Sequence, residues 1–248
     1  MIKYKASPKY TKEFITFLKD IKKHFFKSSH SIHKARNEIK ILTYTTQEIV
    51  VKSFKIPHIL NRISYTLFRS SKAKKSYEYS IKINQFVPKP IGYIEFYNNG
   101  LISESYFISE HFNYDFTIRE PLLNDNFPQK KEILKAFAKF TFELHENKIL
   151  HQDYSPGNIL IKKENDKFVF KIVDINRMLF KAPSLDERLK NFSKLWAKNK
   201  DMKIIIETYA KLISENEEKC LTKALHYSQK NKNFKNFKKR LKGKRVND

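Results

Sequence analysis

Three polar residues in the second half of the chain have the types and the spacing of a phosphate-transfer site. Asp153 and Asn158 lie five positions apart, and Asp174 follows a run of residues that favours a β-strand. Amide and carboxylate oxygens are hard ligands, and such a pair suits a Mg²⁺ ion that shares its other positions with nucleotide phosphates. A neighbouring carboxylate can accept the proton of an attacking hydroxyl. We therefore expect Asn158 and Asp174 to bind the metal and Asp153 to be the base.

The pattern also predicts how the two metal ligands meet. Residues 159–162 and 168–173 favour two strands joined by the polar turn 164–167. Opposed residues of an antiparallel hairpin have a constant index sum, and a sum of about 332 places Asn158 opposite Asp174. Both oxygen ligands are therefore expected at the open end of one hairpin.

Each of these residues has a simpler explanation when it is taken alone. An Asp is common at the N-cap of a helix, and an Asn is common in turns. For all three residues to be structural only, a separate explanation of this kind would be needed for each of them within one loop and hairpin. The combination of Asp153, Asn158 and Asp174 therefore favours a shared site.

Lys52 is the candidate for the cation that a phosphate-transfer site also needs. It lies in Glu48–Phe54, a β-pattern that places Val50, Lys52 and Phe54 on one face of a strand. An ammonium group between two apolar residues needs a carboxylate or a phosphate partner if that face is buried.

Glu78 is the candidate partner of Lys52 within the chain. Residues 49–94 contain nine Lys or Arg residues and one acid, which is Glu78. In the alternative arrangement, Lys52 extends into water at a sheet edge, and Glu78 forms a surface pair with Lys74 or Lys82, four residues away on a predicted helix.

Hydrophobic periodicity predicts strands in the first part of the chain and helices in the last part. Apolar residues at three- and four-residue steps predict helices, and alternating residues predict strands. This order indicates an α+β fold in a single domain of 248 residues. The predicted helices are 8–25, 71–83 with Ser71 as N-cap, 129–147, and most of the chain from Leu185; the predicted strands are 48–54, 91–96, 105–112, 159–162 and 168–173.

Composition excludes several classes of protein. The chain has four Gly residues, so spaced that neither GxGxxG nor GxxxxGK[ST] occurs, which excludes Walker-A ATPases and dinucleotide binders with that fingerprint. A single cysteine, Cys220, excludes an intrachain disulfide and Cys-rich metal motifs. We expect no signal peptide in Met1–Asp20 and no membrane span, because charged residues interrupt every apolar segment.

With these residues in view, the chain resembles the lipopolysaccharide kinase (Kdo/heptose kinase) family of the protein-kinase-like superfamily. The resemblance covers residues 30–200 or so, and Asp153-x4-Asn158 with Asp174 is its most specific part. The other segments that carry it are Ala35-Arg-Asn-Glu38, Val51-Lys-Ser-Phe54, Ser71-Lys-Ala-Lys-Lys-Ser-Tyr77, Pro88-Lys-Pro-Ile91, Ser105-Tyr-Phe-Ile-Ser109 and Asp174-Ile-Asn-Arg177.

The resemblance implies a two-lobed protein-kinase-like fold that uses ATP and Mg²⁺. A small β-rich N-terminal lobe would span residues 1–109 and a mainly helical C-terminal lobe would span 110–228, followed by a basic tail at 229–248.

The family resemblance also assigns a role to each candidate residue. Asp153 would be the catalytic base, and Asn158 and Asp174 would be the metal ligands. Lys52 would contact the nucleotide phosphates, with Glu78 as its orienting partner. The segment Ser105–Phe112, including Ser109 and Glu110, would be the hinge that holds adenine.

Three features depart from the pattern of protein kinases. The turn that would cover the phosphates falls near Ser28–Ala35 and contains no Gly. Gln152 stands where protein kinases commonly have the Arg that reads an activation-loop phosphate, which argues against that regulation. The Asp174-Ile-Asn176 segment replaces Asp-Phe-Gly and so keeps the metal carboxylate without the Gly.

The last 20 residues are strongly basic. Residues 229–248 contain nine Lys or Arg residues and one acid, and Phe234, Phe237 and Leu241 recur at helical steps. Such a helix fits an anionic membrane surface. We do not expect a nucleic-acid partner, because no base-reading module lies beside these charges. The simpler alternatives are a solvated tail and a Lys-rich composition throughout, which gives a net charge of +24.

The residues and the resemblance together predict an ATP-dependent kinase that phosphorylates a hydroxyl of a lipid-linked sugar, with Kdo or heptose of the lipopolysaccharide inner core as the first candidate. We expect the protein in the cytoplasm, peripheral on the inner face of the inner membrane. The alternatives are another small-molecule or protein kinase of this superfamily, and an inactive kinase fold that acts as a basic membrane- or RNA-binding scaffold.

Overall fold

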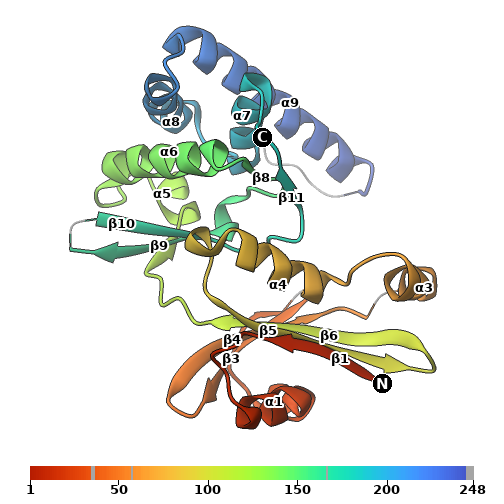
Figure 1. Cartoon of the computed structure of the whole chain (residues 1–248). Coiled ribbons are helices and arrows are strands. Elements are labelled where there is room, and N and C mark those ends of the chain that lie inside the picture. The colour runs from red at the N-terminus through yellow and green to blue at the C-terminus, as the bar shows by residue number, and fades with distance from the viewer. Residues whose placement is uncertain (35–36, 57, 166, 244–248) are drawn as a thin grey trace. The chain divides into compact units, whose positions relative to one another are not determined.

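The computed structural model describes residues 1–34, 37–56, 58–165 and 167–243. The chain divides into two compact units, Met1–Asn113 and Tyr114–Asp248 (Figure 1). The first unit holds the larger sheet and the second holds the longer helices. This distribution confirms the α+β class that the order of the sequence patterns predicts.

A sheet of six strands, counted over the described residues, is the centre of the first unit. Its order is β1-β5-β6-β4-β3-β2, and neighbouring strands are antiparallel. The strand predicted at 48–54 is β4, the one at 91–96 lies within β5, and the one at 105–112 is β6, which begins and ends earlier than predicted. The strands are β1 (Ile2–Ala6), β2 (Ser31–Lys34), β3 (Glu38–Tyr44), β4 (Gln47–Phe54), β5 (Pro90–Asn98) and β6 (Leu101–Glu110).

The helices of the first unit agree with the predicted ones, with two differences. The helix predicted at 8–25 is divided at Asp20, and a helix that the sequence did not reveal follows β4. The predicted N-cap is present, because the Ser71 hydroxyl accepts a hydrogen bond from the Lys74 amide at 3.1 Å. The helices are α1 (Lys12–Lys19), α2 (Ile21–Lys27), α3 (Ile59–Leu67), α4 (Lys72–Lys82) and the short η1 (Asn84–Phe86).

The two faces of the sheet pack against different helices. On one face, Val51 of β4 joins Phe14 and Leu18 of α1 in a buried cluster. On the other face, Phe54 of β4 packs with Tyr77 of α4. The period-2 alternation predicted for β4 is therefore present, and burial on both sides fixes its register.

Helices also form most of the second unit, and its strands are short. The hairpin predicted at 159–173 is β9–β10, which adds β7 to form one small sheet, while β8 pairs with β11. The elements are β7 (Phe116–Thr117), α5 (Arg119–Leu123), α6 (Lys130–Glu146), β8 (Ile149–His151), η2 (Pro156–Asn158), β9 (Ile159–Glu164), β10 (Lys167–Ile172), β11 (Met178–Phe180), α7 (Leu185–Phe192), η3 (Ser193–Leu195), α8 (Asn199–Leu212) and α9 (Glu217–Arg240).

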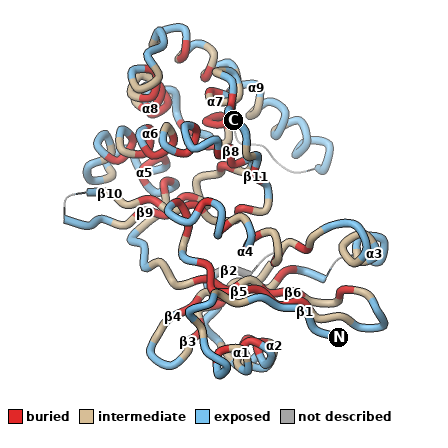
Figure 2. Tube along the Cα trace, viewed as in Figure 1, coloured by how far each residue is buried: buried red, intermediate tan, exposed pale blue. Residues whose placement is uncertain are grey.

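Helix α6 is the main support of the second unit, and Figure 2 shows that one of its sides is buried. The helix lies where the sequence predicts it. Its predicted apolar face is fully buried in the described core, and that face consists of Ile133, Leu134, Phe137, Thr141 and Leu144. Within the described ranges, none of the helices combines the length and the apolar character needed to span a membrane.

A buried polar network joins α6 to α7 and α8. The His145 Nδ1 atom lies 2.7 Å from the Tyr209 hydroxyl, and His145 Nε2 lies 3.2 Å from Asn191 Oδ1. An amide oxygen can only accept, so Nε2 donates to Asn191 and Nδ1 accepts from Tyr209. Burial lowers the pKa of His145 to about 4, so the ring is neutral at pH 7.

This network makes the stability of the protein depend on pH. The unfolded chain binds a proton at His145 near pH 6.5 and the folded chain does so only near pH 4, so stability is lost as the pH falls through that window. For His145 alone, we expect a loss of about 2 kcal/mol of unfolding free energy between pH 7 and pH 5.

The matched control is His145→Gln, which keeps one donor and one acceptor but does not titrate. Urea unfolding at both pH values should show a smaller loss for this variant than for the native protein. An equal loss in the two proteins would show that His145 does not cause the pH dependence.

Candidate active site

The loop between β8 and β9 carries Asp153 and is held from both sides. Tyr154 is completely buried, stacks on Phe137 of α6, and shares a 2.9 Å hydrogen bond with the Thr141 hydroxyl. Pro156 begins the short helix η2, which returns the chain to the sheet at Asn158. Tyr154 is the residue next to Asp153, so its burial fixes the backbone of the loop at this point, while Asp153 itself remains partly exposed.

His151 links this loop to the strand that precedes Asp174. The Asp153 amide donates to His151 Nδ1 at 3.0 Å, and His151 Nε2 lies 3.0 Å from the carbonyl oxygen of Val173. The ring must accept at Nδ1 and donate at Nε2, which defines a neutral tautomer. Burial lowers the pKa of His151, and this keeps the ring neutral at pH 7. The sequence marked His151 only as the start of the motif, and neither its burial nor its two partners could be read from spacing.

Asn158 is tied to the same loop. Its Nδ2 atom donates to the backbone carbonyl of Asp153 at 2.9 Å. Its backbone carbonyl accepts from the Val173 amide, also at 2.9 Å. Because Nδ2 is used in this way, Oδ1 is the atom that Asn158 can offer to a metal.

The predicted register of the hairpin is wrong by one residue. The pairs run from Lys167↔Glu164 to Ile172↔Ile159, so the index sum is 167 + 164 = 331. Asn158 therefore lies opposite Val173, and Asp174 is one position further along. The predicted turn 164–167 is itself centred at 165.5, which corresponds to 331, so the predicted sum of 332 placed the centre half a residue too far along the chain. A one-residue change of register moves each side chain to the opposite face.

Asp174 has an uncommon backbone conformation. Its φ is 56°, in the left-handed region that costs a residue other than Gly about 1–2 kcal/mol. The Asn176 Nδ2 atom donates to Asp174 Oδ1 at 2.8 Å, so the third residue of the Asp174-Ile-Asn176 segment contacts the first. Strained backbone of this kind is frequent at functional sites, where it re-aims a side chain.

The chemistry of these donors fits Mg²⁺. Asn158 supplies an amide oxygen and Asp174 supplies a carboxylate, which are the hard ligands that the ion prefers. In the part of the chain that the structure describes, no group of three or more His, Cys, Asp or Glu side chains could hold a metal alone. Phosphate oxygens and water would have to complete the coordination, as is usual for Mg²⁺ bound with a nucleotide.

Lys52 and Glu78 belong to the first unit, on β4 and α4. Lys52 is partly buried, and its Nζ atom lies 5.3 Å from the centre of the Phe54 ring, on the sheet face against which α4 packs. Glu78 is half exposed and lies 3.9 Å from Lys74, which is the surface pair of the alternative arrangement. The functional coupling of Lys52 to Glu78 stays a prediction.

Ser109 and Glu110 end strand β6. Ser109 is buried and pairs with Val50 of β4, whereas the Glu110 carboxylate forms an ion pair with Lys9 at 2.5 Å. Their predicted contact with adenine stays a prediction. The segment predicted to cover the phosphates, 28–35, includes the strand β2, and its last residue lies outside the described part of the chain.

The structure also places a cation near Asp153 that the sequence did not reveal. Burial lowers the pKa of Lys194 in η3, and the positive charge of Lys235 lowers it further, whereas the carboxylate of Asp153 raises it. Lys190 adds a third positive charge to this group. The three lysines come from η3, α9 and α7, and their distance from Asp153 along the chain left no local signal in the sequence.

Comparisons with known proteins gave a match to one family model and a likeness to solved kinase structures. Residues 99–215 match the model of the lipopolysaccharide kinase (Kdo/WaaP) family. No protein of curated function matches the sequence. Among solved structures, the chain is similar to WaaP in complex with acyl carrier protein, with 12% identity over 92% of this chain and 99% of that chain, at a TM-score of 0.58.

A second similar structure is a Rio2 kinase complex with ADP/Mg²⁺-phosphoaspartate from Chaetomium thermophilum, with 16% identity over 90% of this chain and 71% of that chain, at a TM-score of 0.47. The likeness to WaaP confirms the fold class, and the matched segment contains Asp153, Asn158 and Asp174. The chain therefore has a protein-kinase-like fold, and its residues 99–215 match the model of the lipopolysaccharide kinase (Kdo/WaaP) family.

Proposed function

We propose that this protein transfers the γ-phosphoryl group of ATP to a hydroxyl of a lipid-linked sugar, with Kdo or heptose of the lipopolysaccharide inner core as the acceptor. The observation that carries the proposal is the linkage of Asp153, Asn158 and the strand end before Asp174 by His151 and by backbone hydrogen bonds. The family match over the same residues supports a phosphotransferase.

In this mechanism Asp153 accepts the proton of the sugar hydroxyl while the hydroxyl oxygen attacks the γ-phosphorus of ATP. The bond between that phosphorus and its bridging oxygen breaks, and ADP leaves. Asn158 and Asp174 would hold Mg²⁺, which would neutralise charge on the phosphates when it is bound. Lys52, oriented by Glu78, would contact the phosphates.

Two features support an anionic acceptor rather than a regulated protein substrate. Lys194 places positive charge near Asp153, where the acceptor hydroxyl must lie in this mechanism, and Lys190 and Lys235 add positive charge around Lys194. A sugar acid such as Kdo, or a phosphorylated core, carries the complementary negative charge. Gln152 stands where protein kinases commonly have the Arg that binds an activation-loop phosphate, so we do not expect regulation by activation-loop phosphorylation.

The direct test is incubation of the purified protein with ATP, Mg²⁺ and isolated lipid A–core acceptor, followed by mass spectrometry of the acceptor. We expect the addition of one phosphate to a Kdo or heptose residue. Mg²⁺-dependent binding of ATP without any product would instead favour another acceptor, and no binding of ATP would favour an inactive scaffold.

The proposed role of Asp153 is tested by Asp153→Asn, which keeps the shape and removes the proton acceptor. Turnover should fall by about 100-fold or more, while the affinity for ATP stays close to that of the native protein. Single-turnover rates and ATP binding should be measured on the same preparation. Near-native turnover would remove Asp153 from this role.

The metal ligands are tested by Asp174→Asn and Asn158→Ala. Each variant should bind ATP more weakly by about tenfold at limiting Mg²⁺ and should recover in part at high Mg²⁺, because a missing ligand lowers the affinity for the ion. Titration of ATP binding at several Mg²⁺ concentrations measures this effect. If excess Mg²⁺ restores neither variant, the assignment of the two ligands is wrong.

The coupling of Lys52 to Glu78 is tested by a double-mutant cycle with Lys52→Met and Glu78→Gln. If the two residues act as a unit, the loss of kcat/KM in the double variant, expressed as a free energy, should be smaller than the sum of the losses in the two single variants. Additive losses would support the pairing of Glu78 with Lys74 as a surface contact without a catalytic role.

The basic tail is the proposed membrane contact of the second unit. Residues 229–240 continue helix α9, and Phe234, Phe237 and Leu241 are exposed along it. Deletion of residues 229–248 should reduce sedimentation with anionic vesicles and leave turnover on a soluble, delipidated acceptor nearly intact, because each cation contributes about 1 kcal/mol near such a surface. WaaP was solved with acyl carrier protein, so that protein is the competitor to include in this assay. Equal vesicle binding by both forms would exclude the tail as an anchor.

A further inference from the structure

In helix α3 the polar side chains face the sheet and the apolar side chains face away from it, which is the reverse of a helix that packs on a hydrophobic core. Polar side chains attach it to the sheet: Arg62 Nε donates to the carbonyl of Ile102 at 2.7 Å, and the Thr66 hydroxyl accepts from the Ile102 amide at 3.1 Å. None of its residues is buried. A helix that packs through its apolar side would place those residues against the sheet.

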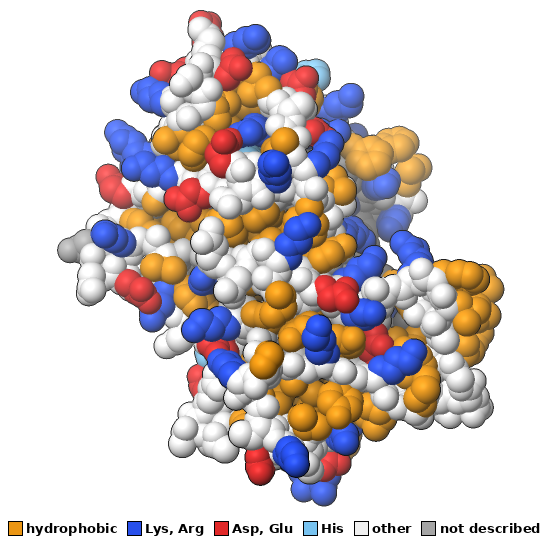
Figure 3. Space-filling view, in the orientation of Figure 1, with side chains coloured by type: hydrophobic (Ala, Val, Ile, Leu, Met, Phe, Trp, Pro, Cys, Tyr) orange, Lys and Arg blue, Asp and Glu red, His pale blue; other side chains and the backbone are white. Residues whose placement is uncertain are grey.

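The apolar side chains of this segment point into solvent. Together they form what we call the α3 ridge, and Figure 3 shows hydrophobic side chains gathered over this helix. Isolated exposed apolar residues are common, but a contiguous group usually marks a surface that contacts something else. The ridge consists of Ile56 (53% exposed), Ile59 (47%), Leu60 (73%), Ile63 (39%), Leu67 (66%) and Phe68 (80%).

The charge around the α3 ridge has one sign. No acidic residue occurs between positions 49 and 77 of the sequence. Lys55 and Arg69 are exposed at the two ends of the ridge, and Lys72 begins the next helix. An apolar strip bordered by cations is the arrangement of helices that lie at the surface of an anionic bilayer.

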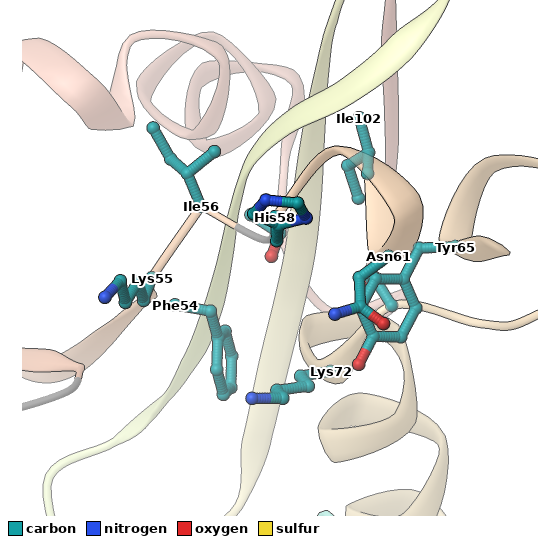
Figure 4. Close-up of a pocket in the computed structure, with 10 residues that line it drawn as sticks. Phe54, Lys55, Ile56, His58, Asn61, Tyr65, Lys72 and Ile102 are labelled. Atoms are coloured by element: carbon teal, nitrogen blue, oxygen red, sulfur yellow. The ribbon is translucent and has the colours of Figure 1, made fainter. Parts of the chain in front are cut away.

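A cavity of about 400 Å³ lies beside the ridge, between α3, the end of β4 and the start of α4. Figure 4 shows the side chains of Lys55, His58, Asn61 and Lys72 around it. The described residues that line it include two lysines and no carboxylate. Its lining therefore suits a negatively charged group with hydrogen-bond acceptors, such as a phosphate.

We propose that the α3 ridge docks on an anionic phospholipid bilayer, with its apolar side chains among the acyl chains and one lipid phosphate in the adjoining cavity. A bilayer matches both features at once, because it offers apolar chains directly beneath a layer of phosphates. The surface is distinct from the basic tail, which belongs to the second unit. Vesicle binding requires no turnover, so this inference stands independently of the proposed kinase activity.

The test uses the full-length protein with Leu60→Gln, Leu67→Gln and Phe68→Gln combined. These side chains are largely exposed, so the triple variant should fold normally. The matched control combines Phe26→Gln and Leu123→Gln, which replace equally exposed apolar residues outside the ridge (88% and 73%). Co-sedimentation is measured with vesicles of phosphatidylethanolamine and phosphatidylglycerol, and with vesicles of phosphatidylcholine alone.

We expect the triple variant to bind the anionic vesicles about tenfold more weakly than the native protein, and the control to bind as the native protein does. A Lys55→Gln, Arg69→Gln variant should weaken binding to anionic vesicles and leave the small binding to neutral vesicles unchanged. The same tenfold effect of the triple substitution should persist when residues 229–248 are deleted.

Two results would overturn the proposal. One is native-like vesicle binding by the triple variant, both with and without the tail. The other is a triple variant that keeps its vesicle binding but no longer binds an acidic protein such as acyl carrier protein in size-exclusion chromatography, which would assign the ridge to a protein partner.

Discussion

The candidate site depends on one buried imidazole. His151 accepts from the amide of Asp153 and donates to the carbonyl of Val173, so a single neutral ring sets the spacing between the loop that carries Asp153 and the strand before Asp174. Both bonds require the Nε2–H tautomer, and a proton added at Nδ1 would remove the acceptor of the Asp153 amide. Burial makes that protonation unfavourable, and so the same environment that hides the ring also preserves the geometry of the site.

The backbone of His151 is itself held from the helical side of the second unit. Asn191 at the end of α7 donates from Nδ2 to the carbonyl of His151 at 2.9 Å and accepts at Oδ1 from His145 of α6. His145 in turn contacts Tyr209 of α8. A buried amide that lost either bond would leave a polar atom unsatisfied, which costs about 1–3 kcal/mol. The position of the loop that carries Asp153 is therefore set by the packing of three helices as well as by its own turn.

The sequence could predict the elements and the motif because those depend on local patterns. The periodicity of 129–147 and the alternation of 48–54 reflect faces that the structure buries. The register between Asn158 and Asp174 depends on where the turn is centred. A difference of half a residue in that centre made Val173, and not Asp174, the residue opposite Asn158. Lys194, which interacts with Asp153, and the two lysines that interact with Lys194 come from three separate elements, and no local pattern records an interaction that only tertiary packing creates.

Helix α3 was not predicted from the sequence, because its apolar side chains do not face a core. The same arrangement supports its proposed role as a membrane-docking surface. Amphipathic patterns predict a helix when a core can cover the apolar side, and here the polar residues Arg62 and Thr66 face the sheet instead. A nine-residue helix is marginal in water by itself, so these two attachments must supply much of its stability. An apolar ridge left in water on so short a helix adds nothing to the folded state of the isolated chain. The arrangement becomes favourable when a second apolar phase covers the ridge, while the attachments to Ile102 stay in place.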